Sequence, residues 1–272
     1  MTGGSASDGK LNGKLALVTG ASRGIGRRVA IRLAEHGARV AVAARSATKR
    51  DDNLGGLDDT VRMVEEAGSS AVPFEVDLSD PAAVVRLAEA VKAELGDIDV
   101  LANVAAKVDA PMYGSFDEMT VEEFRAEFEL NVITHFALMK AFCPGMRKRG
   151  GGVVINYTSR SAQLQEAGKA AVPGKGGTGV GYGATKAAVN RMSNSLANEL
   201  YPFKIAVVAL DPGSTTTENR LQVADRFGFS PEGTHDADLP ARAAAYLATC
   251  PDPMLYTGRI IVSRELVAEF GL

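Results

Sequence analysis

A tyrosine and a lysine four residues apart carry the clearest catalytic signal in this sequence. Tyr182 and Lys186 stand in the segment Tyr-Gly-Ala-Thr-Lys, and this spacing places both side chains on one face of a helix. A phenol ionises near pH 10 and is a poor base at neutral pH, but an adjacent ammonium favours the phenolate. The pair therefore predicts proton transfer to or from an oxygen atom. Taken alone, it also fits a surface tyrosine packed on a lysine stem.

A cluster of glycines near the N-terminus gives a second signal. An apolar run, Leu15–Thr19, leads directly into Gly20, Gly24 and Gly26, and an amphipathic helical pattern follows. A tight turn needs residues without a Cβ, and a pyrophosphate reaches a helix N-terminus only where no side chain blocks the backbone N–H groups. The order of strand, glycine turn and helix therefore predicts a dinucleotide site.

The elements that must position these residues alternate along the chain. Seven short runs rich in Val, Ile, Leu and Ala are nearly continuous, which favours strands covered on both faces of a parallel sheet. Helical patterns lie between them, so we expect an α/β fold, a single-domain Rossmann-type doubly wound sheet of about seven parallel strands with helices on both faces. The expected strands are Leu15–Thr19, Arg39–Ala43, Val72–Val76, Val100–Asn103, Val153–Tyr157, Ile205–Leu210 and Arg259–Val262.

The chain of 272 residues is expected to form one domain over residues 11–272, after a flexible lead-in at residues 1–10. Two stretches interrupt the alternation and are expected to be loops, Ser46–Leu57 and the glycine-rich insertion at residues 163–181. Because the insertion lies between a strand end and Tyr182, we expect it to overhang the active site.

Composition excludes several classes of function. The net charge is −3 and basic residues form no dense run, so no nucleic-acid partner is expected. No uninterrupted apolar stretch is long enough to cross a membrane. Two cysteines suit free thiols in a reducing cytoplasm. The three histidines, His36, His135 and His235, lack metal-ligand spacing, so no metal site is expected.

Residues 19–26 read Thr-Gly-Ala-Ser-Arg-Gly-Ile-Gly, and with Tyr182 and Lys186 they resemble the short-chain dehydrogenase/reductase family. The resemblance covers roughly residues 13–262. It implies an oxidoreductase that interconverts a ketone or aldehyde with an alcohol by hydride transfer, with Tyr182 as general acid and base. It also implies a catalytic tetrad, in which Asn131 holds a water chain to Lys186 and Ser159 orients the substrate. Tyr157, which has no lysine partner, is expected to serve packing.

The same resemblance implies a cofactor site along the carboxyl edge of the sheet. The second strand ends at Ala44 and Arg45, where NAD enzymes place an acidic residue against the ribose 2′-hydroxyl. Arg23 and Arg45 could instead clamp a 2′-phosphate, which predicts NADP(H); the competing interpretation is that both are solvated surface arginines. The expected cofactor-binding residues are Gly20, Ser22, Arg23, Gly24, Ile25, Gly26, Arg45, Asp77, Leu78, Asn103, Tyr182, Lys186, Pro212, Gly213, Thr215 and Thr217.

The sequence departs from the family pattern at four places. Val104 and Ala106 stand where the family has Asn and Gly, Thr215 replaces an aliphatic residue, and Ser159 and Tyr182 enclose 22 residues in place of about a dozen. Near the C-terminus, residues 264–266 replace an expected Asp-Gly-Gly in a region through which the family often forms tetramers. A dimer or tetramer is therefore expected, but its geometry is open.

Several functions remain compatible with these residues. A small-molecule carbonyl or alcohol is the expected substrate, and a 3-oxoacyl thioester reductase is the main competitor among reductases. A non-catalytic NADP(H)-binding sensor is an alternative outside catalysis, which the intact tetrad argues against. An isomerase or dehydratase with the same nucleotide site is a further one, although such relatives usually have longer chains and another glycine spacing.

Overall fold

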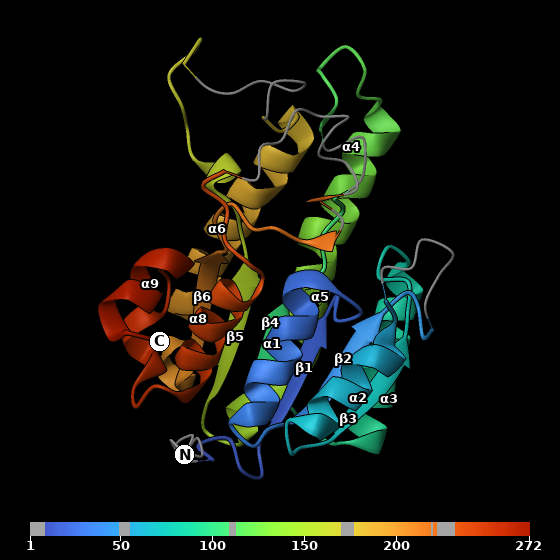
Figure 1. Ribbon diagram of the computed structural model, residues 1–272, viewed down its shortest axis with the longest axis vertical. Coiled ribbons are helices and arrows are strands. Elements are labelled where there is room, and N and C mark those ends of the chain that lie inside the picture. Colours follow the sequence, from blue (N-terminus) through green and yellow to red (C-terminus); the bar gives the residue numbers. More distant parts are fainter. Residues whose placement is uncertain (1–8, 49–54, 109–112, 170–176, 219, 222–231) are drawn as a thin grey trace.

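The computed structural model describes residues 9–48, 55–108, 113–169, 177–218, 220–221 and 232–272. Within this part of the chain, one parallel sheet has the strand order β3-β2-β1-β4-β5-β6-β7, so the order reverses between β1 and β4 at the centre (Figure 1). Such a switch point is where open α/β sheets bind ligands. The strands are β1 (Leu15–Thr19), β2 (Arg39–Ala44), β3 (Ala71–Glu75), β4 (Val100–Asn103), β5 (Gly152–Tyr157), β6 (Ile205–Asp211) and β7 (Ile260–Val262).

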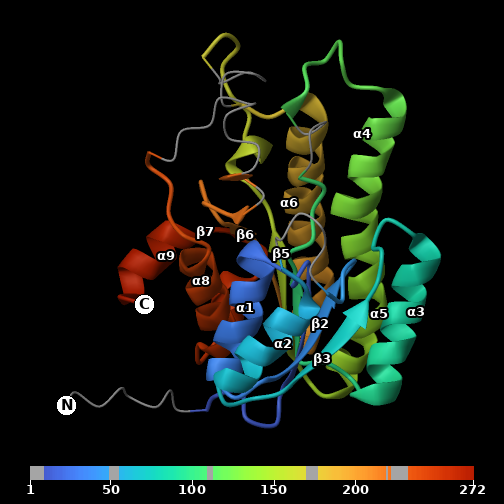
Figure 2. The same cartoon turned by 45° about the vertical axis from the view of Figure 1, so that its right-hand side comes forward.

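Helices cover both faces of the sheet (Figures 1 and 2). On one face lie α1 (Gly24–Glu35), α2 (Leu57–Glu66), α8 (Asp238–Thr249) and α9 (Ser263–Phe270). On the other lie α3 (Pro81–Glu94), α5 (Thr134–Lys148) and α6 (Val180–Leu200), with α4 (Val121–Phe128) extending beyond the sheet. Short helical turns occupy Glu129–Ile133, which is a π-helix, and Arg160–Ala162, Tyr201–Phe203 and Pro253–Tyr256, which are 3₁₀-helices.

The hydrophobic core lies in two layers, one on each face of the sheet. Along β1, Ala16 and Val18 contact the layer beneath α1 and α8, whereas Leu15 and Leu17 contact the layer beneath α3, α5 and α6. Every residue of β1 and β6 is buried. The nearly continuous apolar runs in the sequence therefore do belong to strands packed on both sides.

The strand and helix predictions can be compared with the structure element by element. Each strand begins and ends within one residue of its expected bounds. The insertion expected over residues 163–181 is shorter, because α6 begins at Val180. A Cβ at Gly181 would lie 2.3 Å from the Glu127 carboxylate, so this glycine allows close packing inside a helix.

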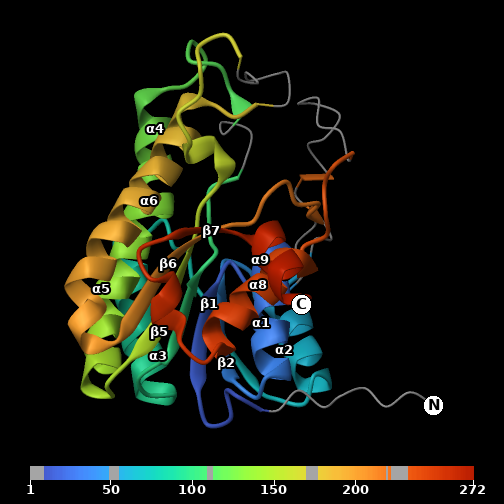
Figure 3. The same ribbon diagram turned by 90° about the vertical axis from the view of Figure 1, so that its left-hand side faces the viewer.

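Parts of three expected loops lie outside the described residues, namely 1–8 of the lead-in, 49–54 and 170–176. Figure 3 shows that the described segments after β4, β5 and β6 gather at one end of the sheet, the end at which α6 begins. Because all seven strands are parallel, this is where their carboxyl ends meet. The residues with catalytic potential lie at this edge.

Candidate active site

The glycine turn after β1 has a backbone that only glycine adopts readily. Gly20 and Gly24 have φ of 66° and 54°, and a Cβ at Gly26 would lie 2.3 Å from the Gly20 carbonyl oxygen. The residue before α1, Arg23, is extended, and no side-chain hydrogen bond caps the helix. The N-terminus of α1 is thus presented at the switch point of the sheet, where it fits a pyrophosphate.

Thr19 fastens this turn to the segment that follows β4. Its Oγ1 accepts hydrogen bonds from the backbone N–H of Val104 at 3.0 Å and of Ala105 at 3.1 Å, and donates to the Ala102 carbonyl at 3.4 Å. A Cβ at Gly20 would lie 3.0 Å from the Ala105 Cα, so the two backbones are in close contact. The sequence motif pointed to the glycines but did not reveal this role of Thr19.

Asn103, at the end of β4, is fully buried in the sheet. Its Nδ2 donates to Asn156 Oδ1 at 2.8 Å, and Asn156 Nδ2 in turn donates to Ser193 Oγ at 3.0 Å. The side chain therefore joins β4 to β5 and α6. Its expected contact with a cofactor stays a prediction.

The structure brings Ser159, Tyr182 and Lys186 together beside the end of β5. The Ser159 hydroxyl, two residues after that strand, is hydrogen-bonded to Tyr182. Lys186 Nζ donates to the Tyr157 carbonyl at 2.8 Å and lies 5.6 Å from the centroid of the Tyr182 ring. Tyr157 has the expected packing role, since its hydroxyl donates to the Pro240 carbonyl at 3.1 Å.

Burial controls the ionisation of these side chains. Lys186 is 1% exposed, and burial lowers its pKa to about 8. Burial also raises the pKa of Tyr182, which the nearby Tyr113 raises further and the hydrogen bond from Ser159 opposes. The Tyr–Lys spacing predicted a lowered tyrosine pKa, whereas here burial outweighs that effect. Tyr182 therefore keeps its proton at neutral pH.

Asn131 lies in a π-helical turn that separates α4 from α5. The chain widens at Glu129–Ile133, a feature that often marks functional positions. Asn131 is fully buried; its Nδ2 donates to Thr185 Oγ1 at 3.1 Å, and its Oδ1 accepts from the backbone N–H of Lys107 at 2.7 Å. It thus connects the segment after β4 to α6, one residue from Lys186.

The residues expected at the adenosine end of a cofactor lie on β1 to β3 and α1. Arg45 directly follows β2 and is exposed, and Arg23 precedes α1. The Ser22 carbonyl accepts a hydrogen bond from Arg27, while Ile25 packs against the core. Past β3, Asp77 Oδ1 accepts from the Ser79 N–H at 3.0 Å and from its hydroxyl at 2.7 Å, and the Leu78 carbonyl accepts from Thr134 Oγ1 at 2.7 Å.

The segment after β6 folds back onto the glycine turn. Gly213 has a φ of 71° and donates its N–H to Asp211 Oδ1 at 2.9 Å, while Thr215 Oγ1 donates to the Pro212 carbonyl at 3.2 Å. Thr215 therefore bonds within its own loop. A Cβ at Gly24 would lie 3.4 Å from Thr217 Cγ2, which places Thr217 against the glycine turn. Its expected contact with a cofactor stays a prediction.

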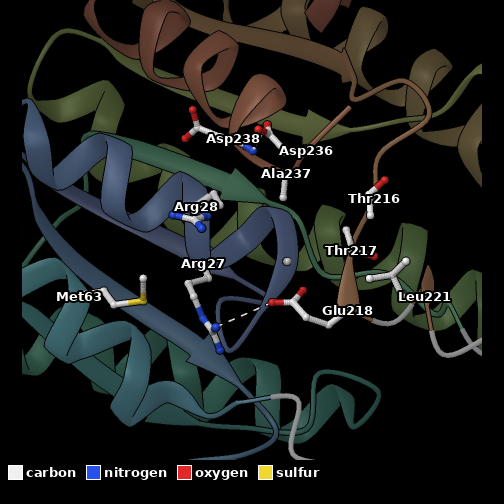
Figure 4. Close-up of a pocket in the computed structure, with 11 residues that line it drawn as sticks. Arg27, Arg28, Met63, Thr216, Thr217, Glu218, Leu221, Asp236, Ala237 and Asp238 are labelled. Carbon is white, nitrogen blue, oxygen red and sulfur yellow. Dashed lines mark hydrogen bonds and ion pairs between the residues drawn. The ribbon is translucent and has the colours of Figure 1, made fainter. Parts of the chain in front are cut away.

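A cavity of about 290 Å³ opens beside α1 and this segment (Figure 4). Arg27 and Glu218 approach each other across it, with 3.8 Å between Nη1 and Oε1. Its lining, which adjoins the glycine turn rather than Tyr182, comprises Gly24, Arg27, Arg28, Met63, Thr216, Thr217, Glu218, Leu221, Asp236, Ala237 and Asp238.

Three buried residues near the site were missed at the sequence level. Tyr113 is close enough to Tyr182 to influence its pKa, Glu127 lies against the first turn of α6, and His135 is hydrogen-bonded to the Ala105 carbonyl. Each is polar within an otherwise unremarkable segment, and polar residues in such segments usually face solvent. Only the fold shows that they point inward.

Two expected absences can be examined over the described residues. These contain no group of three or more His, Cys, Asp or Glu side chains suited to a metal ion. Among the described helices, none is long and apolar enough to cross a membrane. Both cysteines are free thiols, and burial raises the pKa of Cys143 to about 11.

Residues 14–226 of this chain match the family model of short chain dehydrogenases. This chain belongs to the short-chain dehydrogenase/reductase family. The 7alpha-hydroxysteroid dehydrogenase of Escherichia coli (strain K12) is 30% identical over 209 residues, which make up 77% of this chain and 74% of that relative. The sheet order and the glycine turn described above are therefore those of an oxidoreductase family.

Solved structures extend the likeness to nearly the whole chain. A 7alpha-hydroxysteroid dehydrogenase complexed with NADH and 7-oxo glycochenodeoxycholic acid has a TM-score of 0.78 at 27% identity, covering 96% of each chain. A blue fluorescent protein from a metagenomic library, in complex with NADPH, has a TM-score of 0.77 at 29% identity, covering 93% of this chain and 97% of that one. These neighbours hold different nucleotides, so the choice made by this chain rests on its own residues.

Proposed function

We propose that this short-chain dehydrogenase is an NADP(H)-dependent oxidoreductase that interconverts a ketone or aldehyde with an alcohol, with Tyr182 as the general acid and base. The observation that carries the proposal is the meeting of Ser159, Tyr182 and Lys186 at one strand end, with Asn131 one side chain away. Three segments that are far apart in the sequence converge there, and together they supply the groups that carbonyl reduction needs.

Each side chain has a distinct task in this proposal. The bound nicotinamide supplies the hydride in reduction and takes it up in oxidation. The Ser159 hydroxyl donates a hydrogen bond to the carbonyl oxygen, where negative charge develops. Tyr182 gives that oxygen its proton, and burial, which raises the pKa of Tyr182, keeps the proton available at neutral pH.

Lys186 and Asn131 act behind Tyr182. Lys186 Nζ uses one donor on the Tyr157 carbonyl, and its remaining donors are proposed to hold the ribose hydroxyls of the cofactor. Asn131 supports α6 through Thr185 and is proposed to maintain the water chain that returns a proton to Lys186. With its pKa lowered to about 8, Lys186 can pass a proton on near neutral pH.

The preference for NADP(H) is proposed from the residues around the end of β2. Ala44 leaves no carboxylate at the position where an NAD enzyme reads the ribose. Arg45 follows it, and Arg23 stands at the start of α1. Two guanidinium groups bind a phosphate dianion strongly and in a defined geometry. The same proposal includes the other cofactor-binding residues that were expected from the sequence, among them Ser22 and Thr217.

We also propose a homo-oligomer, a dimer or tetramer, and a cytoplasmic location. Ile133, in the π-helical turn that carries Asn131, and Phe136, in the first turn of α5, have exposed side chains, which supports burial against a second copy. The two free thiols support a reducing compartment. Light scattering coupled to size exclusion would test the assembly, and a monomer at micromolar concentration would contradict it.

The function is tested by following absorbance at 340 nm with NADPH and with NADH over a panel of ketones, aldehydes and 3-oxoacyl thioesters. We expect turnover with NADPH at a higher kcat/KM than with NADH for at least one carbonyl class. Tight NADPH binding with no turnover across the panel would instead identify a sensor. Equal use of NADH would overturn the cofactor assignment alone.

A further inference from the structure

His135 lies in the first turn of α5, four residues after Asn131, and is fully buried. Its Nε2 is 3.1 Å from the Ala105 carbonyl oxygen. A carbonyl only accepts hydrogen bonds, so Nε2 must carry the hydrogen and Nδ1 must be the bare nitrogen. Nδ1 is buried and has no hydrogen-bond partner among the residues that the structure describes. The imidazole is thus held in this position by a single directed contact.

The charge state of this imidazole is fixed by its surroundings. Burial and, to a smaller extent, the nearby ammonium of Lys186 lower the pKa of His135 to about 3. The side chain is therefore neutral at every pH at which the protein works. The hydrogen bond from His135 to the Ala105 carbonyl therefore does not depend on pH.

Ala105 is held on three sides, and His135 provides one of them. Its N–H donates to Thr19 Oγ1 at 3.1 Å, its Cα lies 3.0 Å from where a Cβ would stand on Gly20, and its carbonyl meets His135. Two residues further on, the N–H of Lys107 donates to Asn131 Oδ1 at 2.7 Å. One helical turn therefore fixes the segment that supports the glycine turn.

We infer that His135 is a positioning residue, which sets the height of the Ala105 backbone beneath the glycine turn and thereby aligns the cofactor with the turn that carries Asn131. Gly20 contacts Ala105, whose carbonyl is bound by His135, and Lys107 of the same segment is bound by Asn131, which in turn is bonded to Thr185 of α6. This inference rests on the proposed function in one respect, namely that the glycine turn binds a nicotinamide cofactor.

An apolar side chain would fill this buried site without leaving an unpaired nitrogen. The imidazole leaves Nδ1 unpaired but supplies the Nε2–H donor to the Ala105 carbonyl, which no apolar side chain could supply. The family pattern is also altered in the segment around Ala105, where Val104 and Ala106 replace Asn and Gly. The side chains of Val104 and Ala106 form no hydrogen bonds, so the hydrogen bond from His135 of α5 helps to fix the position of this segment.

The test compares His135→Gln with His135→Met. The glutamine Nε2 can reach the Ala105 carbonyl much as the imidazole Nε2 does, whereas methionine fills the space without a donor. Two readouts apply: the dissociation constant of NADPH, or of NADH if the wild type binds it more tightly, from nicotinamide fluorescence, and hydrogen–deuterium exchange of residues 103–108 in the cofactor-free protein. Ser69→Ala is the matched control, since it removes a 2.7 Å hydrogen bond to the Ala38 carbonyl at the opposite edge of the sheet.

We expect His135→Met to raise the dissociation constant about tenfold, the effect of one hydrogen bond, and to speed exchange in residues 103–108. His135→Gln should stay within about threefold of wild type, and Ser69→Ala should change neither readout. Equal losses in the two His135 variants, or none in His135→Met, would overturn the inference. If His135→Met does not fold, the glutamine variant decides on the same limits. The exchange result needs no cofactor, so it stands apart from any failure of the proposed function.

Discussion

The region around β5 and α6 and the region around β1 and β2 hold their charged groups at different depths. Lys186 is 1% exposed and donates to the Tyr157 carbonyl at 2.8 Å, and its uncharged neighbour Asn131 is fully buried as well. Arg45, at the other end of the expected cofactor site, is exposed. Both regions lie on the same edge of one sheet, so the difference does not arise from the fold alone.

The contrast follows from what each region is proposed to do. A proton donor and its helper need altered pKa values, and burial alters them, as it does for Lys186 and Tyr182. Recognition of a phosphate needs only a reachable positive charge, which costs little at the surface. Substitutions in the buried region should therefore change stability as well as turnover, and those at the surface only cofactor preference.

The largest expected effect comes from Tyr182→Phe. Loss of the hydroxyl removes the proposed proton donor, and turnover should fall by about 10²- to 10⁴-fold, the usual contribution of a positioned acid. The fold should be preserved, because the ring keeps its place in α6. Steady-state rates with the best carbonyl substrate measure the loss, and a variant that retained a tenth or more of wild-type turnover would remove Tyr182 from the chemistry.

Lys186→Met should lower turnover by roughly 10²-fold yet stabilise the cofactor-free protein at pH 7. Folding lowers the lysine pKa from 10.5 to about 8, so at pH 7 the wild type must bury a charged ammonium. Removing this cost should raise the free energy of unfolding by about 2–3 kcal/mol after the lost hydrogen bond to the Tyr157 carbonyl is subtracted. Urea titrations of both proteins measure the difference.

The pH dependence gives this prediction its sign. Below pH 8 the lysine is charged in the folded and unfolded states, and the burial cost is fully present. Between pH 8 and 10.5 the folded protein loses this proton first, so the wild type gains stability and the advantage of the methionine shrinks to nothing. An advantage that grew over this range would contradict the account.

Arg45→Ser tests the surface region. Loss of one charge-assisted hydrogen bond to a 2′-phosphate should reduce the ratio of kcat/KM for NADPH over NADH by about 10- to 100-fold. The free energy of unfolding should change by less than about 0.5 kcal/mol. Arg39→Ser is the matched control, because Arg39 is also exposed but begins β2 at the opposite edge. If Arg45→Ser and Arg39→Ser changed this ratio equally, the assignment of Arg45 as a residue that binds the 2′-phosphate would be wrong.

The smallest effect on turnover is expected from Tyr157→Phe. Its hydroxyl is buried near Ser159 but donates to the Pro240 carbonyl, away from the chemistry. Activity should stay within about twofold of wild type, while stability falls by about 1 kcal/mol from the lost hydrogen bond. A large loss of turnover without a loss of stability would show that the Tyr157 hydroxyl takes part in the chemistry and does not serve packing alone.

The strands could be predicted from the sequence because their residues leave little choice. Runs such as Val-Val-Ile-Asn-Tyr in β5 are buried on both faces, so only a parallel sheet accommodates them. The proposed catalytic residues could be placed because Tyr182 and Lys186 share a helix face, and Ser159 follows a strand that ends at the same edge. Residue spacing and sheet topology together are therefore enough to predict that these three residues lie at one edge of the sheet.

The remaining features depend on tertiary contacts that spacing does not encode. The widened turn at Asn131 has no distinct residue pattern, and Thr19 acts through its Oγ1 on two backbone N–H groups of a distant segment. His135 reads as an ordinary helix residue until the fold places the Ala105 carbonyl opposite it. Single polar residues in amphipathic helices face solvent far more often than they face a site.

The central claim, that this chain moves a hydride with Tyr182 as the proton donor, is tested most directly by isotopic labelling. NADPH deuterated at both C4 positions would be incubated with the best carbonyl substrate, and the alcohol analysed by mass spectrometry. The account predicts one deuterium on the carbinol carbon with the wild type and at most a trace of product with Tyr182→Phe. An alcohol without deuterium, or equal labelled product from both proteins, would contradict it.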